Sequence, residues 1–207
     1  NANALISPFT GSVDVDGFDL TDIDEVEFRD AAANATAAGR LRRNAGRLTY
    51  YASAVAQVVG GVLTVDTTAV GTLGAGEDDL ITYALPASTL SVLNRGIRIT
   101  AWGSNQANAN AKTIKLYFGT ANLYNSSSVV MNNTKWRVTA EVYRTGVAGQ
   151  DFGAVLLEGS PPTGAANGVN SGTATQDETT ALTIKCTGEG TANNDVVQEG
   201  LLVELLN

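Results

Sequence analysis

Histidine is missing from this 207-residue chain, and cysteine occurs once, as Cys186. Without histidine the chain has no Ser–His–Asp triad and no Cys–His nucleophile, and it lacks the commonest general base. Zinc sites are built from Cys and His ligands, so no zinc site is expected. A lone cysteine forms no intramolecular disulfide, and the alternation of Cys186 with Leu182 and Ile184 predicts a buried, unreactive thiol.

Charged and aromatic residues are also scarce. They make up 16% and 6% of the chain, whereas an average soluble domain has about 25% charged residues. Asn, Thr, Ser and 22 glycines supply the polar surface and the turns instead. The net charge of −8 repels phosphate groups, and no run approaches the ~20 apolar residues that span a bilayer. We therefore expect neither nucleic acid nor a membrane as a partner.

One basic cluster stands against this acidic background. Its members are Arg40, Arg42, Arg43 and Arg47. They flank residues 44–46, where Asn and Gly favour a tight β-hairpin. Because no aromatic residues are interleaved, we favour a solvated or inter-subunit role for the cluster over contact with nucleic acid.

The N-terminal segment is acidic and irregular. Residues 12–30 carry eight acidic side chains, broken by a few large apolar residues such as Phe18 and Phe28. Their spacing fits neither the helix nor the strand period, so an extended arm that docks on a neighbour is predicted. The carboxylates of residues 14–22 suggest calcium, but the spacing of a full calcium loop is lacking, and a solvated acidic arm is the simpler interpretation. Residues 31–38 are Ala-rich and could add a short helix.

From about residue 67 the pattern becomes regular. Apolar and polar residues alternate with a period of two over about eight to ten segments, which are separated by Gly, Asn and Pro. This predicts an all-β protein: an antiparallel, jelly-roll-like β-sandwich over residues 67–207, preceded by an extended N-terminal arm with a small hairpin over residues 1–66. Residues 159–176 are rich in Gly, Ser, Thr and Pro, and they predict a long exposed loop with a short strand near its end.

An ordered series of motifs runs through the C-terminal part. It comprises Asp79-Leu80-Ile81-Thr82-Tyr83-Ala84-Leu85-Pro86, Gly96-Ile97-Arg98-Ile99-Thr100-Ala101-Trp102-Gly103, residues 108–119, Trp136-Arg137-Val138, residues 177–185 and Val203-Glu204. In this order the motifs resemble a jelly-roll domain of bacteriophage tail-fibre, head-fibre and decoration proteins. The resemblance covers residues 67–207 well and residues 39–51 weakly. It implies a virion-surface location, contacts with capsid or tail proteins, a homotrimer and, in some members, recognition of host glycans.

The aromatic residues divide into core and surface candidates. Trp136 shares the phase of Val138 and Val142, which predicts the core. Trp102 falls opposite Ile97 and Ile99, so we expect it at a subunit interface, over an open sheet edge or against a sugar ring.

If the sandwich binds glycans, the stacking candidates are Trp102, Tyr117 and Tyr143, with Tyr124 as a further one. Attachment to the particle is predicted to involve Phe18, Phe28, Arg40, Arg42 and Arg43.

Catalysis is not expected. Glycoside hydrolysis needs only two well-separated carboxyl groups, and the chain offers Glu141, Asp151, Glu158, Asp177 and Glu178. An active site of that kind usually adds aromatic residues in a cleft, and these are few. Together with the resemblance to phage domains, the sequence implies a structural virion-surface protein of a bacteriophage without a cofactor or metal, with a carbohydrate-binding β-sandwich as the alternative.

Overall fold

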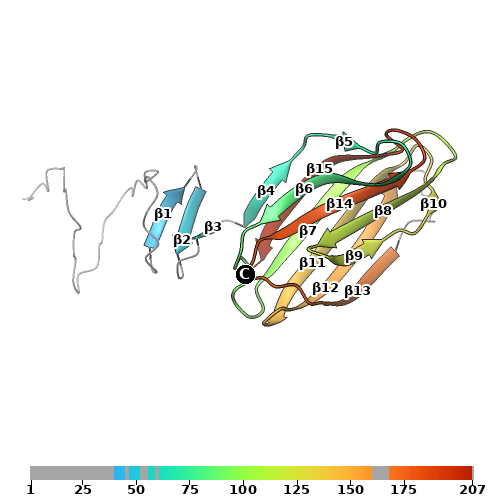
Figure 1. Cartoon of the computed structure of the whole chain (residues 1–207). Helices are drawn as coiled ribbons and strands as arrows, with labels where there is room; N and C mark the ends of the chain where they lie inside the picture. Colours follow the sequence, from blue (N-terminus) through green and yellow to red (C-terminus); the bar gives the residue numbers. More distant parts are fainter. Residues whose placement is uncertain (1–39, 45–46, 52–55, 59–60, 160–167, 207) are drawn as a thin grey trace, which may run out of the picture.

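The computed structural model describes residues 40–44, 47–51, 56–58, 61–159 and 168–206, and the regular structure in these ranges is entirely β-strand (Figure 1). The first three strands, β1 (Arg40–Asn44), β2 (Arg47–Tyr51) and β3 (Ala56–Val58), form a small antiparallel sheet. Arg40 pairs with Tyr51 and Asn44 pairs with Arg47, so β1 and β2 form the expected hairpin. The acidic arm and residues 31–38 lie outside the described residues.

The remaining strands form two sheets. Their bounds are β4 (Val62–Asp66), β5 (Val70–Gly71), β6 (Gly76–Leu85), β7 (Gly96–Asn105), β8 (Ala111–Phe118), β9 (Ala121–Asn125), β10 (Val129–Val130), β11 (Lys135–Gly146), β12 (Gly149–Gly159), β13 (Gly168–Ala174), β14 (Leu182–Gly190) and β15 (Val196–Leu206). The smaller sheet has the order β10-β8-β14-β6, with β9 beside β8. The larger sheet has the order β13-β12-β11-β7-β15-β4, with β5 beside β15.

The pairing of these strands is that of a jelly roll. Eight strands form its framework, and in chain order they are β4, β6, β7, β8, β9, β11, β14 and β15. In the larger sheet the first of these strands lies beside the eighth, the eighth beside the third and the third beside the sixth. In the smaller sheet the order is second, seventh, fourth and fifth, and these two orders together define a jelly roll. Strands β12 and β13 extend the larger sheet beyond β11. The predicted all-β sandwich is thus confirmed, and it includes β4, which precedes the predicted boundary at residue 67.

The core lies between the two sheets and follows the alternation in the sequence. On β7, Ile97 and Ile99 are fully buried, whereas Trp102 lies on the opposite, outer face. Trp136 is only 2% exposed, as its phase predicted, and Cys186 is buried on the inner face of β14. Because burial raises the pKa of the Cys186 thiol, this group is inert, in line with the expectation.

The strand directions give the sandwich two distinct ends. The chain enters at Gly61, whose carbonyl accepts a hydrogen bond from the amide of Leu205, and Leu206 pairs with Gly96. We call this end, where Figure 1 marks the C-terminus, the proximal end; it carries the loops at residues 86–95, 119–120, 147–148 and 175–181. The opposite, distal end carries the loops at residues 72–75, 106–110, 126–134 and 191–195.

A buried polar network closes the distal end. The carboxylate of Asp195, which is fully buried, accepts hydrogen bonds from the side chains of Asn108 (2.6 Å) and Asn110 (3.0 Å) and from the amides of Thr191 (2.8 Å) and Ala192 (2.9 Å). Burial alone would raise the pKa of Asp195, but these hydrogen bonds outweigh it and lower the pKa to about 2. The network therefore holds Asp195 ionised inside the protein.

Lys112 belongs to the same network. Its side chain is fully buried, and its ammonium donates to Asn108 Oδ1 at 2.7 Å and to the carbonyl of Asn110 at 3.0 Å. The two asparagines thus touch the anion with their amide nitrogens and the cation with oxygen atoms. Burying either Asp195 or Lys112 alone would cost much free energy. Here the two opposite charges are buried together, and Asn108 and Asn110 link them.

A second network ties the loops of the proximal end together. Glu178 is 5% exposed and accepts hydrogen bonds from Arg144 Nε (2.6 Å), the amide of Ala148 (3.0 Å) and Gln150 Nε2 (3.2 Å). Its carbonyl accepts from the amide of Ser88. Through its carboxylate and its backbone carbonyl, Glu178 thereby connects three of the proximal loops.

Candidate functional site

An open hollow lies on the outer face of the larger sheet. It is lined by Thr139, Glu141, Tyr143, Gly153, Ala154, Val155, Val169 and Asn170 from strands β11, β12 and β13. Gly153 stands opposite Glu141 in the β11–β12 register, and a Cβ at Gly153 would meet no atom within 4 Å. The missing side chain leaves the floor of the hollow open, while Val169, 83% exposed, stands free on β13.

Tyr143 is held in a defined position beside this hollow. Its ring packs over Gly96 of the neighbouring strand β7, where a Cβ would come within 2.5 Å of Cδ1. Its hydroxyl donates to Glu141 Oε2 at 3.0 Å. Since the side chain remains 37% exposed, one amphipathic ring is both fixed in place and open to a ligand.

Glu141 is fixed from the other side by Arg98. The guanidinium donates from Nε (3.0 Å) and from its terminal amino group (2.8 Å) to Glu141 Oε1. These hydrogen bonds, together with that of Tyr143, lower the pKa of Glu141. The carboxylate is therefore ionised at neutral pH, and it can still accept hydrogen bonds on its free lone pairs.

This arrangement suits binding better than hydrolysis. An exposed aromatic ring, a carboxylate and the hydroxyl of Thr139 around an apolar floor can hold a polyol by stacking and hydrogen bonds. A glycosidase needs one carboxyl group with a raised pKa as its general acid. Glu141 has the opposite shift, and Glu178 lies in the proximal network, away from this hollow.

Trp102 lies on the same outer face. Its ring packs over Gly200 of β15, a position where any larger residue would collide with the indole. In the β11–β7 register Trp102 pairs with Arg137 and Gly96 pairs with Tyr143, which puts the two rings about 20 Å apart along the strands. Tyr143 and Trp102 thus share one face but not one pocket.

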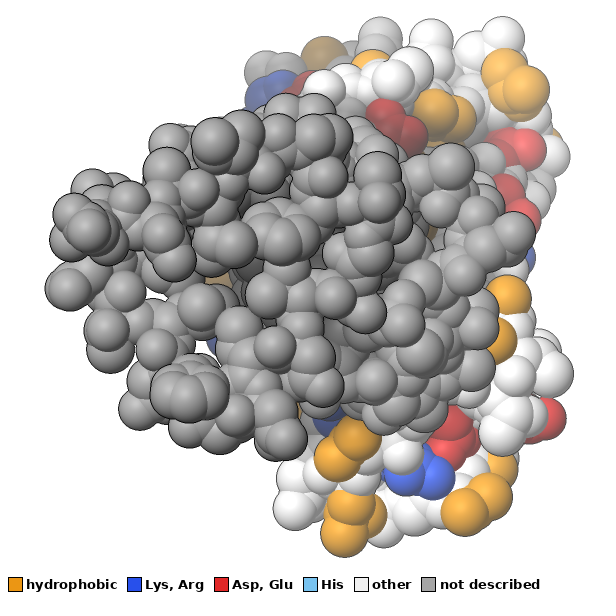
Figure 2. All heavy atoms as spheres, turned by 90° about the vertical axis from the view of Figure 1, so that its left-hand side faces the viewer, with side chains coloured by type: hydrophobic (Ala, Val, Ile, Leu, Met, Phe, Trp, Pro, Cys, Tyr) orange, Lys and Arg blue, Asp and Glu red, His pale blue; other side chains and the backbone are white. Residues whose placement is uncertain are grey.

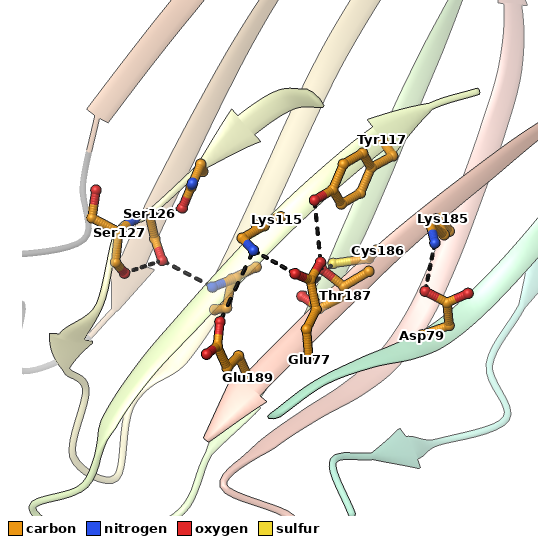
Figure 3. A network of polar contacts seen from close by, with 12 residues as sticks. Glu77, Asp79, Lys115, Tyr117, Ser126, Ser127, Lys185, Cys186, Thr187 and Glu189 are labelled. Atoms are coloured by element: carbon orange, nitrogen blue, oxygen red, sulfur yellow. Dashed lines mark hydrogen bonds and ion pairs between the residues drawn. The ribbon is translucent and has the colours of Figure 1, made fainter. Parts of the chain in front are cut away.

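Tyr117 faces the other way, on the outer surface of the smaller sheet. In Figure 3, Glu77 lies between Lys115, Tyr117 and Thr187, and the pair of Lys185 and Asp79 lies alongside. The ammonium of Lys185 is 5.4 Å from the centroid of the Tyr117 ring. The tyrosine is thus engaged by its own neighbours, since a cation covers its ring and Glu77 binds its hydroxyl.

The remaining predicted site residues divide into two groups. Tyr124 is 5% exposed and belongs to the core, so it is no stacking platform. It points inward from β9, and the alternation of the sequence had not determined which face of the strand it occupies. Phe18 and Phe28 lie outside the described residues. Arg40, Arg42 and Arg43 lie on β1, of which the backbone pairing alone is described.

Arg98, Thr139 and Gly153 were not singled out from the sequence. Their roles depend on which residues stand opposite one another across β7, β11 and β12, and pairing between strands leaves no mark in a single sequence. The signal that could have drawn attention to them is the alternation of β11, which places Thr139, Glu141 and Tyr143 on one face.

Comparison with protein-family models finds no match, and comparison with curated proteins finds none either. The likeness to phage fibre and decoration domains therefore stays a prediction from the sequence. Within the described ranges, no three Cys, Asp or Glu side chains are grouped so as to hold a metal ion. The same part of the chain contains no helix with the length and apolar character of a membrane span.

Proposed function

We propose that this chain is a non-catalytic structural protein on the surface of a bacteriophage particle, as a head-fibre, decoration or tail-fibre module. The observation that supports the proposal most is the polarity of the sandwich. Gly61 and Leu206 both lie at the proximal end, because Gly61 bonds Leu205 and Leu206 pairs with Gly96. A domain tethered at one end leaves its distal loops and both broad sheet faces free for display.

The segments that carry the sequence resemblance have structural roles, which fits a scaffold. Residues 79–86 belong to β6 and its end, residues 96–103 to β7, and residues 108–119 to the distal loop and β8. In this proposal the partners are capsid or tail proteins and two further copies of the chain. The N-terminal region, including Arg40, Arg42 and Arg43, makes the attachment.

Purified particles test this proposal. An antiserum against the full chain, used for immunogold labelling together with mass spectrometry of the particles, is expected to detect the chain at regular positions on the particle surface. Light scattering of the full chain is expected to give three times the chain mass. If the chain is missing from the particles, the virion proposal fails, and a monomer removes the trimer from it.

A second candidate function is recognition of host-cell glycans, and the hollow beside Tyr143 favours it. There a fixed, 37% exposed ring adjoins an ionised carboxylate and an open glycine floor. On a glycan array the full chain is expected to bind a restricted set of saccharides.

The substitution Tyr143→Ala should abolish that binding. The matched control Tyr117→Ala on the opposite sheet should keep it, because that ring is already covered by Lys185. An array without hits, or equal binding by Tyr143→Ala and the parent chain, would contradict glycan recognition at this hollow.

A further inference from the structure

The distal polar network brings an amine, an amide and a carboxylate together inside the protein. Figure 2 shows basic and acidic side chains at the surface, where water solvates them. Lys112 and Asp195 are instead fully buried, and Asn108 contacts both of them. This set of groups can do more than neutralise charge, because a desolvated lysine amine is a nucleophile and a side-chain amide has an electrophilic carbon.

The lysine nitrogen lies within reach of the amide carbon. Lys112 Nζ is 2.7 Å from Asn108 Oδ1. Since a carbonyl bond is about 1.2 Å long, Nζ lies no more than about 4 Å from Asn108 Cγ. Reacting atoms about 3–3.5 Å apart are close enough for attack, so a small movement of the lysine side chain suffices. Burial lowers the pKa of Lys112 and favours the neutral amine that attacks, although the charge of Asp195 opposes this effect.

The two polar atoms of the Asn108 amide are held by the groups that acyl transfer requires. The backbone amide of Asn110 donates to Asn108 Oδ1 at 3.0 Å. A donor in this position stabilises the negative charge that develops on the oxygen when a nucleophile adds to the carbon. On the other side, Asn108 Nδ2 donates to Asp195 Oδ1 at 2.6 Å. The carboxylate therefore touches the nitrogen that has to accept protons before it can leave.

We propose that Lys112 and Asn108 form an intramolecular isopeptide bond, with the Asp195 carboxylate relaying protons to the departing nitrogen. Lys112 Nζ adds to Asn108 Cγ, the bond between Cγ and Nδ2 breaks, and a new amide joins Nζ to Cγ. The lysine ammonium gives up two protons in all, and the departing nitrogen takes up two. One ammonium ion leaves, and no oxidant or other reactant is required. This inference does not depend on the proposed function, since it concerns chemistry within one domain.

The product fits the site as well as the reactants do. A neutral amide replaces the buried ammonium of Lys112, which removes the cost of keeping that cation out of water. The new amide retains one N–H, which can donate to Asp195 in place of the lost Nδ2 group. Asp195 also keeps its hydrogen bonds from Asn110, Thr191 and Ala192. The bond would close the loop at residues 108–112 covalently, at the point where it enters β8.

Mass spectrometry of the intact full chain tests the proposal. The purified chain is expected to be lighter than its sequence mass by one ammonia molecule, about 17 Da. Trypsin then locates the change, because it does not cleave after a modified lysine. Residues 99–115 contain no basic residue between Arg98 and Lys115 other than Lys112. They should therefore remain one peptide with the same loss of mass.

Each other mass result would overturn the proposal. A chain of unchanged mass contains no such bond. A loss of ammonia with normal cleavage after Lys112 would indicate ring closure at an asparagine without the lysine. A loss of water, about 18 Da, would indicate a bond from Lys112 to a carboxylate such as Asp195 instead of to Asn108.

Three variants separate the roles of the residues. Lys112→Met lacks the nucleophile and Asp195→Asn lacks the proton relay, so both are expected to keep their full sequence mass. Lys115→Met is the matched control on the same strand, because Lys115 pairs with Glu77 on the outer face, and this variant should still lose ammonia. If Asp195→Asn loses ammonia as completely and as fast as the parent chain, Asp195 is not the proton relay. The mass of the parent chain decides whether the bond exists even where a variant fails to fold.

Discussion

The two ends of the sandwich bury charge in different ways. At the distal end, Asp195 and Lys112 are both fully buried, and Asn108 and Asn110 bind both of them. At the proximal end, Glu178 is well bound, but Arg95 keeps a covered donor without an acceptor. The distal end is complete within the described residues, and the proximal end is not.

The difference lies in the kind of group that is left unpaired. A neutral group at the distal end, Asn105 Oδ1, is also covered and unpaired, but its Nδ2 donates to Thr134 Oγ1 at 2.9 Å. An unpaired amide oxygen costs less than an unpaired guanidinium donor. The two ends thus differ. At the distal end the buried charges bind one another's neighbours, whereas at the proximal end, where the chain joins the sandwich at Gly61, a charged donor is left without an acceptor.

The largest expected effect is the loss of the distal anion. Asp195→Ala removes the acceptor of hydrogen bonds from four donor groups and leaves Lys112 buried without its countercharge. Breaking a buried charge pair in this way should lower the free energy of unfolding by about 3–5 kcal/mol, as measured by urea denaturation. Glu199→Ala is the control, because it removes a partly exposed pair with Lys135 and a hydrogen bond from Ser104, and it should cost about 1 kcal/mol. Equal effects of the two variants would show that the distal network is not a special source of stability.

The same residue should dominate the response to acid. The pKa of Asp195 is about 2 in the folded protein, and it is about 3.9 in an unfolded chain. A lowered folded pKa contributes stability that is fully present above the unfolded value and is lost as the pH falls through the folded one. Stability should therefore fall by about 2 kcal/mol between pH 4 and pH 2. In Asp195→Asn the unfolding free energy should change less over this range, and an unchanged slope would place the acid sensitivity elsewhere.

The alternation of the sequence was sufficient to predict the strands. Ile97 and Ile99 face the core, Trp102 faces outward, and Trp136 and Cys186 are buried, since a strand presents successive residues to opposite faces. The hairpin in which Asn44 pairs with Arg47 followed from local chemistry in the same way. These features depend on neighbours within one segment.

Features that depend on distant segments could not be predicted. The burial of Lys112 was not predicted, because it depends on the loop before this residue and on Asp195, more than eighty residues later. The hollow at Tyr143 arises because Gly153 stands opposite Glu141. The β8–β9 pairing has a register shift between Asn122 and Tyr124, so the regular alternation of inward and outward residues does not hold on β9.

A moderate effect is expected at the proximal network. Glu178→Gln keeps the shape of the side chain and can still accept the hydrogen bond from Ala148, but it removes the charge that faces Arg144. The free energy of unfolding should fall by about 1–3 kcal/mol, less than in Asp195→Ala, because the partly buried arginine retains its bond to the carbonyl of Ser91. Urea denaturation at pH 7 measures this change. A loss equal to that of Asp195→Ala would mean that the two ends are equally critical.

The smallest effect is expected for Arg95, and a matched pair of arginines isolates it. Arg144→Met leaves Glu178 buried without its cation and should cost about 3 kcal/mol. Arg95→Met removes a guanidinium whose covered NH1 group has no hydrogen-bond partner, and methionine replaces the apolar part of the side chain. The free energy of unfolding should stay within about 0.5 kcal/mol of the parent value, because the desolvation penalty disappears together with the charge. If Arg95→Met costs as much as Arg144→Met, then Arg95 is a structural residue of the sandwich, and the contrast between the two ends disappears.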